Sequence, residues 1–388
     1  MQAFTSKYIF DGSALLENKV VLVDNGFIHG IVDYPLPNKQ TSRSNIFNNS
    51  SVNPIITNLG EGVITSGFID LQVNGCGGVL FNEQISLNTL EIMYQTWLKF
   101  GTTSFLPTLI SCDFKDVLKA LAVVKQWFLK FGNKRGVLGI HLEGPFISKI
   151  KRGIHPEQSI ISPTMELLCQ ITAYRRFFPI KMTIAVEEFT QAQIQFLLDE
   201  QIIVAIGHSN ANHAQVLASI ELGVGTATHM FNAMSGLTAR NPGVIGAILN
   251  SDIYTGVIAD GLHVAAANIN ILTKLKPDQV YLVTDAVTPS GTNLDTFQIC
   301  GQTLYVRNGE CITQDGTLGG AYLTMNKALE YCIKECNLSL ANSLAMASTI
   351  PAVVMKVDDI IGRIKSGYRA DLIYLDLNNF SCWKIAMD

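Results

Sequence analysis

The chain has 388 residues, of which 48% are hydrophobic and only 15% are charged, and its formal net charge is −4. This length and apolar content suffice for one large domain plus a smaller one, and the composition argues against a long disordered tail. The weakly acidic balance excludes a broad basic surface for nucleic acid, and we recognise neither a membrane-spanning stretch nor a signal peptide.

Residues 1–60 predict the first part of a small β-domain. Strand-like runs lie at 7–10 (KYIF), 20–32 (VVLVDNGFIHGIV) and 53–59 (NPIITNL), and a polar segment at 35–51 is typical of a loop. The last part, 356–388, contains GRIKSGYRADLIYLDL, which predicts a turn followed by a strand. Because chain termini often lie close together, we expect this strand to pair with the N-terminal ones and complete a small β-sandwich domain.

Residues 61–355 predict a (β/α)8 barrel, because apolar strand-like runs alternate there with helical periodicity. The eight expected strands are 67–74, 103–108, 137–143, 181–187, 203–208, 226–231, 253–260 and 279–285, and the helical patterns are 87–100, 114–131, 190–200, 211–222 and 265–275. After them come a β-like stretch at 298–312 and helical patterns near 322–337 and 340–349. A doubly wound open sheet is the alternative, but the glycine-rich segment 74–78 (NGCGG) lacks its GxGxxG phosphate turn.

Four polar residues stand at the ends of separate predicted strands: Glu143, His208, His229 and Asp285. Chemistry in such barrels sits at this end of the strands and in the loops that follow. One carboxylate and two imidazoles suit a borderline-soft metal such as zinc. The remaining carboxylate, Asp285, is then available as a general base that takes a proton from the attacking water.

Each of these residues also has a structural interpretation. Glu143 can form a buried ion pair, and Asp285 can cap a helix. A single histidine at a strand end is more often a satisfied polar residue than a ligand, but neighbouring strand ends lie within ~5 Å, which one metal ion can bridge. Two such histidines, His208 and His229, therefore favour a metal site. His141 shares the strand face of Glu143 and is either its partner or a core histidine.

Loop residues after the strands predict a substrate-binding layer. The segment SKIKRGIHPEQ carries His155, which can donate a hydrogen bond to a developing oxyanion. Asn232 and Arg240 follow His229, and His263 follows the seventh strand in DGLH. An arginine and a histidine near the open face can hold a phosphate, although each alone is more often a surface charge.

Several motifs together resemble the N-acetylglucosamine-6-phosphate deacetylase family of the amidohydrolase superfamily. They are SGFIDLQVNGCGG, HLEGPF with RGIHP, GHSNA, ATHMFNAM, NPGVIGAIL, IADGLHV, LVTDAV and GTLGGAYLTM, and they cover nearly the whole chain. The resemblance implies Glu143, His208 and His229 as metal ligands, Asp285 as the catalytic acid/base, and His155 as the residue that polarises the acetyl carbonyl. It implies substrate contacts from Ile154, Asn232, Ala233, Arg240, His263, Leu318, Gly319, Gly320 and Ala321, with Arg240 and His263 on the phosphate side.

The chain departs from the superfamily pattern at three places. Gln72 and Asn74 stand where many amidohydrolases carry the HxH pair that holds a second metal, and neutral amides are poor zinc ligands. This indicates one tightly bound metal per subunit. Ser66 replaces the usual proline before GFID, which concerns only local turn rigidity. Gly319 and Ala321 stand where the resemblance leads us to expect Ala and Ser, so one hydroxyl contact to the sugar is missing.

The predicted function is metal-dependent hydrolysis of N-acetylglucosamine 6-phosphate to glucosamine 6-phosphate and acetate. The alternatives are a galactosamine-6-phosphate deacetylase, another amidohydrolase, and a non-catalytic scaffold. The predicted cofactor is one Zn²⁺, with Fe²⁺, Co²⁺ and Mn²⁺ as alternatives. The resemblance implies a homodimer with a shared phosphate site, and we expect no nucleic-acid or membrane partner. Eight scattered cysteines without a CxxC pair predict reduced thiols in a cytoplasmic protein.

Overall fold

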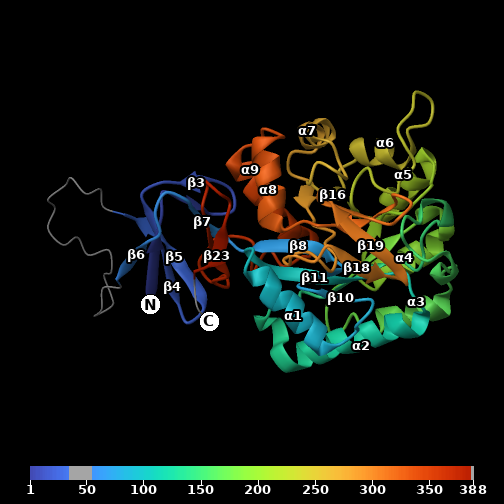
Figure 1. Ribbon diagram of the computed structural model, residues 1–388, viewed down its shortest axis with the longest axis horizontal. Coiled ribbons are helices and arrows are strands. Elements are labelled where there is room, and N and C mark those ends of the chain that lie inside the picture. The colour runs from blue at the N-terminus through green and yellow to red at the C-terminus, as the bar shows by residue number, and fades with distance from the viewer. Residues whose placement is uncertain (35–54, 386–388) are drawn as a thin grey trace.

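The computed structural model describes residues 1–34 and 55–385 (Figure 1). The predicted polar loop at 35–51 lies outside these residues. The larger part of the described chain forms a barrel with helices around it, and a smaller all-β unit lies at one side, where both chain ends are found (Figure 1). None of the described helices is both long and apolar enough to cross a membrane.

Eight parallel strands form the barrel, and each pairs with the next one along the chain. They are β8 (Phe68–Val73), β11 (Thr102–Ile110), β12 (Ile140–Glu143), β13 (Ile180–Ile184), β14 (Ile203–Ile206), β15 (Thr226–Ala227), β16 (Tyr254–Val257) and β17 (Val280–Leu282). The ends of β8 and β17 are joined by a 3.0 Å hydrogen bond from the Asp285 amide to the Gln72 carbonyl, and by a bridge between Val73 and Ala286. The structure confirms the predicted barrel and places a strand in each of the eight predicted runs.

Helices follow most of the strands and cover the barrel (Figure 1). They are α1 (Leu87–Leu98), α2 (Phe114–Phe131), α3 (Met165–Thr172), α4 (Gln191–Asp199), α5 (His213–Leu222), α6 (Gly243–Leu249), α7 (Ala266–Leu275), α8 (Met325–Lys334), α9 (Leu340–Ala347) and α10 (Thr349–Val354). Side chains of Thr190 and Asn212 accept hydrogen bonds from the first turns of α4 and α5, which fixes where these helices begin. The sequence prediction omitted α3, α6 and α10.

The small unit consists of two sheets built from both ends of the chain. One contains β5 (Phe27–Asp33), β4 (Lys19–Asp24), β1 (Gln2–Thr5) and β6 (Ile56–Asn58), and the other contains β23 (Cys382–Lys384), β22 (Leu372–Leu375), β7 (Val63–Ser66), β2 (Tyr8–Phe10) and β3 (Leu15–Leu16). The strand β22 pairs antiparallel with β7, and β7 pairs with β2, so the C-terminal strand joins the same sheet as an N-terminal strand. The β7 strand extends this sheet beyond residue 60.

A separate antiparallel sheet covers part of the open end of the barrel. It contains β18 (Thr296–Ile299), β19 (Gln302–Arg307), β20 (Glu310–Ile312) and β21 (Leu318–Ala321), in agreement with the β-like stretch predicted near residue 300. A short hairpin, β9 (Gly75–Cys76) and β10 (Val79–Leu80), follows β8. The amide of Ala321 donates to the Asp285 carbonyl over 2.9 Å, so β21 is tied directly to the end of the eighth barrel strand.

Candidate active site

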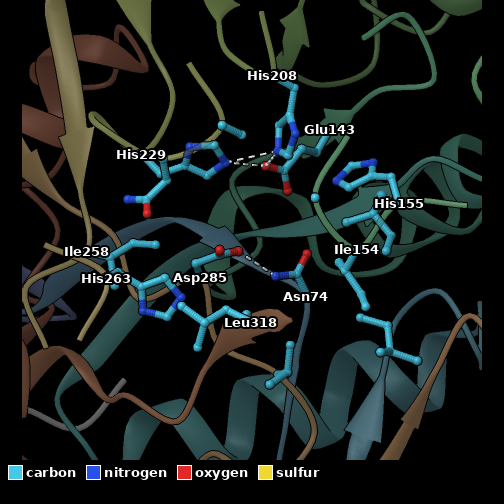
Figure 2. A pocket seen from close by; sticks show the side chains of 17 residues that line it. Asn74, Glu143, Ile154, His155, His208, His229, Ile258, His263, Asp285 and Leu318 are labelled. Atoms are coloured by element: carbon cyan, nitrogen blue, oxygen red, sulfur yellow. Dashed lines mark hydrogen bonds and ion pairs between the residues drawn. The ribbon is translucent and has the colours of Figure 1, made fainter. Parts of the chain in front are cut away.

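Glu143, His208 and His229 converge at the open end of the barrel (Figure 2). Glu143 is the last residue of β12, and the histidines lie two residues beyond β14 and β15. Glu143 Oε1 lies 3.1 Å from His208 Nε2 and 2.9 Å from His229 Nε2, and the two Nε2 atoms are 3.1 Å apart. All three side chains are buried. These are the three predicted ligands, and they form a group, called the metal set below, that could hold one metal ion.

The surroundings of His208 fit it for this role. Its Nδ1 atom lies 2.8 Å from the carbonyl oxygen of Lys151, which can only accept. The Nδ1 atom therefore donates to that carbonyl, and Nε2, which donates to Glu143 Oε1, would bind a metal in place of its own proton. Burial opposes ionisation of Glu143, but hydrogen bonds from His208 and His229 outweigh it and hold the pKa of the carboxyl well below its usual range. The donor set thus fits a divalent cation.

Backbone strain is concentrated at the same place. His208, His229 and Asp285 have φ angles of +46°, +26° and +52°, and Ala233 has +53°. Residues other than glycine avoid positive φ, and they keep it only where the surrounding structure holds them. The chain therefore turns sharply just after several strands, which directs these side chains to the centre of the barrel mouth. This explains why β15 is only two residues long, although the sequence predicted a strand to residue 231.

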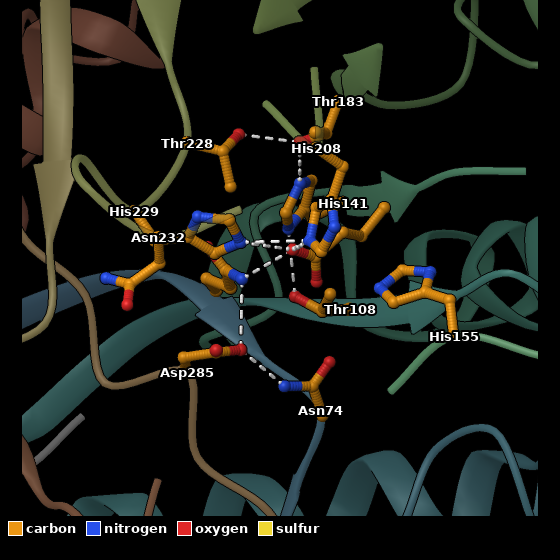
Figure 3. A network of polar contacts seen from close by, with 12 residues as sticks. Asn74, Thr108, His141, His155, Thr183, His208, Thr228, His229, Asn232 and Asp285 are labelled. Atoms are coloured by element: carbon orange, nitrogen blue, oxygen red, sulfur yellow. Dashed lines mark hydrogen bonds and ion pairs between the residues drawn. The ribbon is translucent and has the colours of Figure 1, made fainter. Parts of the chain in front are cut away.

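Asp285 faces the metal set from the eighth strand (Figure 3). Its Oδ1 atom accepts hydrogen bonds from Asn74 Nδ2 at 2.7 Å and from Gln72 Nε2 at 3.0 Å. The same Gln72 nitrogen donates to Glu143 Oε1 at 3.0 Å, so one amide bridges the two carboxylates. Burial and the charge of Glu143 raise the pKa of Asp285 to about 6. A base with that pKa is well matched to proton transfer near neutral pH.

His155 is a neutral hydrogen-bond donor at the edge of the site. Burial and the neighbouring His208 lower the pKa of His155 to about 3. Its Nδ1 atom accepts the backbone N–H of Ser111 at 3.2 Å and lies 2.9 Å from the Ser111 hydroxyl oxygen. The proton of the neutral ring is therefore on Nε2. The ring centroids of His155 and His208 lie 4.5 Å apart and the rings are tilted by 51°, which places this donor beside the metal set.

The remaining predicted contacts fall into two groups. Lining the same pocket as the metal set are Asn74, Ile154, Asn232, Ala233, His263, Leu318 and Gly320. Ile110, Ile258, Val287 and Ile299 complete its apolar wall (Figure 2 shows several of these side chains). Gly319 and Ala321 belong to β21 but do not line the pocket, and Gln72 lies behind it. Arg240 is exposed on the loop after His229, so the structure does not bring it to this pocket.

Four further residues act on the site, and sequence reasoning missed them. Asp260 Oδ2 lies 2.6 Å from His263 Nδ1, and Ser111 contacts His155 as described. Asp70 and Thr284 are hydrogen-bonded partners beneath Asp285. The DGLH motif could have indicated Asp260, because it places this residue near His263. Asp70 could have been found as a residue on the same strand face as Gln72, two positions earlier. Nothing in the sequence links Ser111 to His155 or Thr284 to Asp70.

His141 proves to be a core histidine. Its ring nitrogens lie 3.2 Å from the hydroxyl of Thr108 and 2.7 Å from that of Thr183, and no hydrogen bond joins it to Glu143 (Figure 3). Thr183 in turn contacts Thr228 at 2.6 Å. These hydroxyls satisfy the buried imidazole within the barrel. His141 is therefore not a direct hydrogen-bonding partner of Glu143.

Comparison with known proteins agrees with this geometry. A family model described as the amidohydrolase family matches residues 63–386. An N-acetylglucosamine-6-phosphate deacetylase from Haemophilus influenzae is 39% identical over 319 residues, covering 80% of this chain and 81% of the relative. An N-acetylgalactosamine-6-phosphate deacetylase from a Shewanella species is 38% identical over 323 residues, covering 82% of this chain and 80% of the relative.

A solved structure shares the same arrangement over almost the full length. The crystal structure of N-acetylglucosamine-6-phosphate deacetylase from Pasteurella multocida superposes with a TM-score of 0.90 at 38% identity. The match covers 98% of this chain and 96% of that one. The similarity therefore includes the barrel, the covering sheet and the small two-sheet unit.

Proposed function

This chain belongs to the amidohydrolase family, and we propose that it hydrolyses the acetamide of N-acetylglucosamine 6-phosphate to glucosamine 6-phosphate and acetate. One observation carries the proposal. A metal-ligand set, a buried carboxylate of raised pKa and a neutral imidazole donor face one pocket in a chain similar to deacetylases over about four fifths of its length. These are the parts that hydrolysis of an unactivated amide requires.

Glu143, His208 and His229 would hold one divalent metal, for which we propose zinc, with iron, cobalt or manganese as alternatives. When bound, such an ion lowers the pKa of a water molecule and polarises a carbonyl oxygen. Gln72 and Asn74 donate to Asp285 through their amide nitrogens, so both are engaged in orienting the base. This use of the two amides supports a single metal site.

The protein groups divide the proton transfers between them. Asp285, ionised, takes a proton from the attacking water as its oxygen adds to the acetyl carbon. The Nε2–H of His155 donates to the acetyl oxygen as negative charge develops on it. Asp285 then returns the proton to the nitrogen as the C–N bond breaks, so the products are a free amine and acetate. His263, held by Asp260, and Asn232 would orient the sugar phosphate in the pocket.

The phosphate supports the proposal of a homodimer. No lysine or arginine lines the pocket among the residues that the structure describes, yet a phosphate dianion needs cationic partners. We propose that Arg240 of the partner subunit supplies this charge, since in each subunit Arg240 is exposed on a loop.

The eight unpaired cysteines support the proposal that the enzyme works in the reducing cytoplasm.

A second candidate substrate is N-acetylgalactosamine 6-phosphate, because a relative named for that activity is as similar as one named for the glucosamine substrate. The test is a comparison of kcat/KM for the two epimers with the metal-loaded enzyme. We expect the ratio to favour the glucosamine substrate. A ratio that favours the galactosamine epimer would reassign the sugar and leave the hydrolytic mechanism in place.

A further inference from the structure

Asp70 is a buried carboxylate that the proposed mechanism does not use. It lies on β8 with no exposed surface, two residues before Gln72. Its Oδ1 atom accepts from the Gln72 amide and from the Thr284 amide, each at 3.2 Å. Its Oδ2 atom accepts from the Thr284 hydroxyl at 2.5 Å. Burial raises the pKa of Asp70 to about 7, and the hydrogen bonds from Thr284 and Gln72 oppose that rise.

Thr284 carries this contact onward to the backbone of Asp285. The Thr284 hydroxyl oxygen accepts the N–H of Ala286 at 3.2 Å, so this side chain links the residues before and after Asp285. The Asp285 amide donates to the Gln72 carbonyl at 3.0 Å, and the Asp285 carbonyl accepts from Ala321 at 2.9 Å. The residue is thereby held at a φ of +52°, a conformation that an aspartate does not favour without such support.

The held conformation decides where the Asp285 carboxylate points. Figure 3 shows it directed to the Asn74 amide beside the metal-ligand set. A relaxed φ would rotate the side chain away from both amides, since the backbone sets the direction of the Cα–Cβ bond. The support therefore comes from a carboxylate that contacts neither the pocket nor the metal ligands.

We propose that Asp70 is a positioning residue for Asp285, acting through the Thr284 hydroxyl that holds the left-handed turn of the base. This inference rests on the proposed function, in which Asp285 moves the protons. The rival explanation is that the pair only closes the barrel between β8 and β17. That role would affect stability but would leave the turnover of folded enzyme unchanged.

The test compares three threonine variants in the metal-loaded enzyme. Thr284→Val keeps the shape and removes the hydroxyl, whereas Thr284→Ser keeps the hydroxyl. Thr255→Val is the matched control, because Thr255 is equally buried on the neighbouring strand β16 and its hydroxyl has only a 3.5 Å contact to the adjacent Gly256 carbonyl. Each variant is assayed for kcat, KM, metal content and thermal unfolding, and Asp70→Asn serves as a second test of the acceptor.

We expect Thr284→Val and Asp70→Asn to lower kcat about 10- to 100-fold, with KM and metal content within about two-fold of wild type. Thr284→Ser and Thr255→Val should retain wild-type kcat. Normal kcat in folded Thr284→Val, or an equal loss in Thr255→Val, would overturn the proposal. A crystal structure of Thr284→Val provides a readout without turnover: the Asp285 carboxylate should leave Asn74, and an unmoved carboxylate also contradicts the proposal. If wild type releases no acetate, the proposed function fails, and the crystal structure alone decides the positioning role.

Discussion

Two buried carboxylates of this site, Glu143 and Asp285, have pKa values pushed in opposite directions by their surroundings. Hydrogen bonds from two imidazoles outweigh burial and keep the Glu143 carboxyl ionised, whereas burial and the charge of Glu143 raise the pKa of Asp285. Such separation assigns different roles to chemically similar groups. Glu143 suits a permanent metal ligand, and Asp285 suits a group that gains and loses a proton.

Asp285→Asn tests the acid/base role. The amide keeps the size of the side chain but cannot take a proton, and Asp285 is not one of the three metal-ligating residues. We expect metal content to stay at the wild-type level while acetate release falls about 10³-fold, within the usual range for loss of a general base. Turnover close to wild type in metal-loaded Asp285→Asn would remove Asp285 from the mechanism.

The pH dependence of kcat/KM follows from the same residue. Because Asp285 must be ionised to act as a base and its pKa is raised to about 6, activity should fall as the pH drops through that value. A bound divalent cation nearby favours the carboxylate, so it can move this acid limb only to lower pH. Initial rates across the acid and neutral range should show the limb at about pH 6 or below. An acid limb well above neutral pH would assign the titration to another group.

At the scale of elements, β21 fixes the end of the eighth barrel strand. Gly320 in β21 has a φ of +74°, and a Cβ atom there would lie 2.4 Å from Val287 Cγ1 and 3.0 Å from the Asp285 carbonyl oxygen. Gly316 in the preceding loop has a similar φ of +86°, but a Cβ atom there would meet nothing within 4 Å. Both glycines adopt a left-handed backbone that would strain an alanine, but they differ in what a Cβ atom would contact.

Alanine at each position separates these two effects. Gly316→Ala should cost about 1 kcal/mol of unfolding free energy from strain alone. Gly320→Ala should cost a further ~1–3 kcal/mol from overpacking, and it should lower kcat because Asp285 shifts. Denaturant unfolding and steady-state kinetics measure both. Equal destabilisation by the two substitutions would show that a Cβ atom at position 320 does not overpack the end of the eighth strand.

Much of the architecture could be predicted because it depends on local patterns. The eight strands are apolar runs bounded by glycine and polar residues, and their polar ends indicated the proposed metal ligands and the proposed base. The sequence of α6, GVIGAIL, has two glycines, which weaken a helix, and β-branched residues, which favour a strand. In the structure Gly246 allows close approach, since a Cβ there would lie 2.5 Å from Pro242 Cβ. Val244, Ala247 and Ile248 of this helix are buried in the main core, so tertiary packing overrides local propensity here.

The residues that support the site could not be predicted for a different reason. Thr284 and Asp70 are 214 positions apart, and Ser111 and His155 are 44 apart, so only the closed barrel brings each pair together. Left-handed backbone at His208 and His229 also depends on neighbouring strands. The ligands have residue types that suggest chemistry, whereas their supports are ordinary buried polar residues.

At the scale of the whole molecule, the proposed dimer predicts complementation between a variant that binds phosphate poorly and a variant that lacks the base. Arg240→Ala should raise KM for the phosphorylated sugar and leave turnover of an unphosphorylated N-acetyl sugar unchanged, because only phosphate binding is lost. Co-expressed with Asp285→Asn, it should form hybrids in which one site combines an intact Asp285 with Arg240 from the other subunit. Recovery of activity at low substrate concentration in the hybrids is the expected result. Hybrids no more active than the separate variants would exclude a shared site.

All of the proposed residue roles serve one reaction at one metal site. The most direct measurement is the release of acetate and free amine from N-acetylglucosamine 6-phosphate by purified protein, before and after metal is removed and restored. We predict equal amounts of both products, activity that rises with metal content to a maximum at one ion per subunit, and loss of both metal and activity in Glu143→Gln. Absence of acetate release from either hexosamine 6-phosphate by metal-loaded protein would contradict the account.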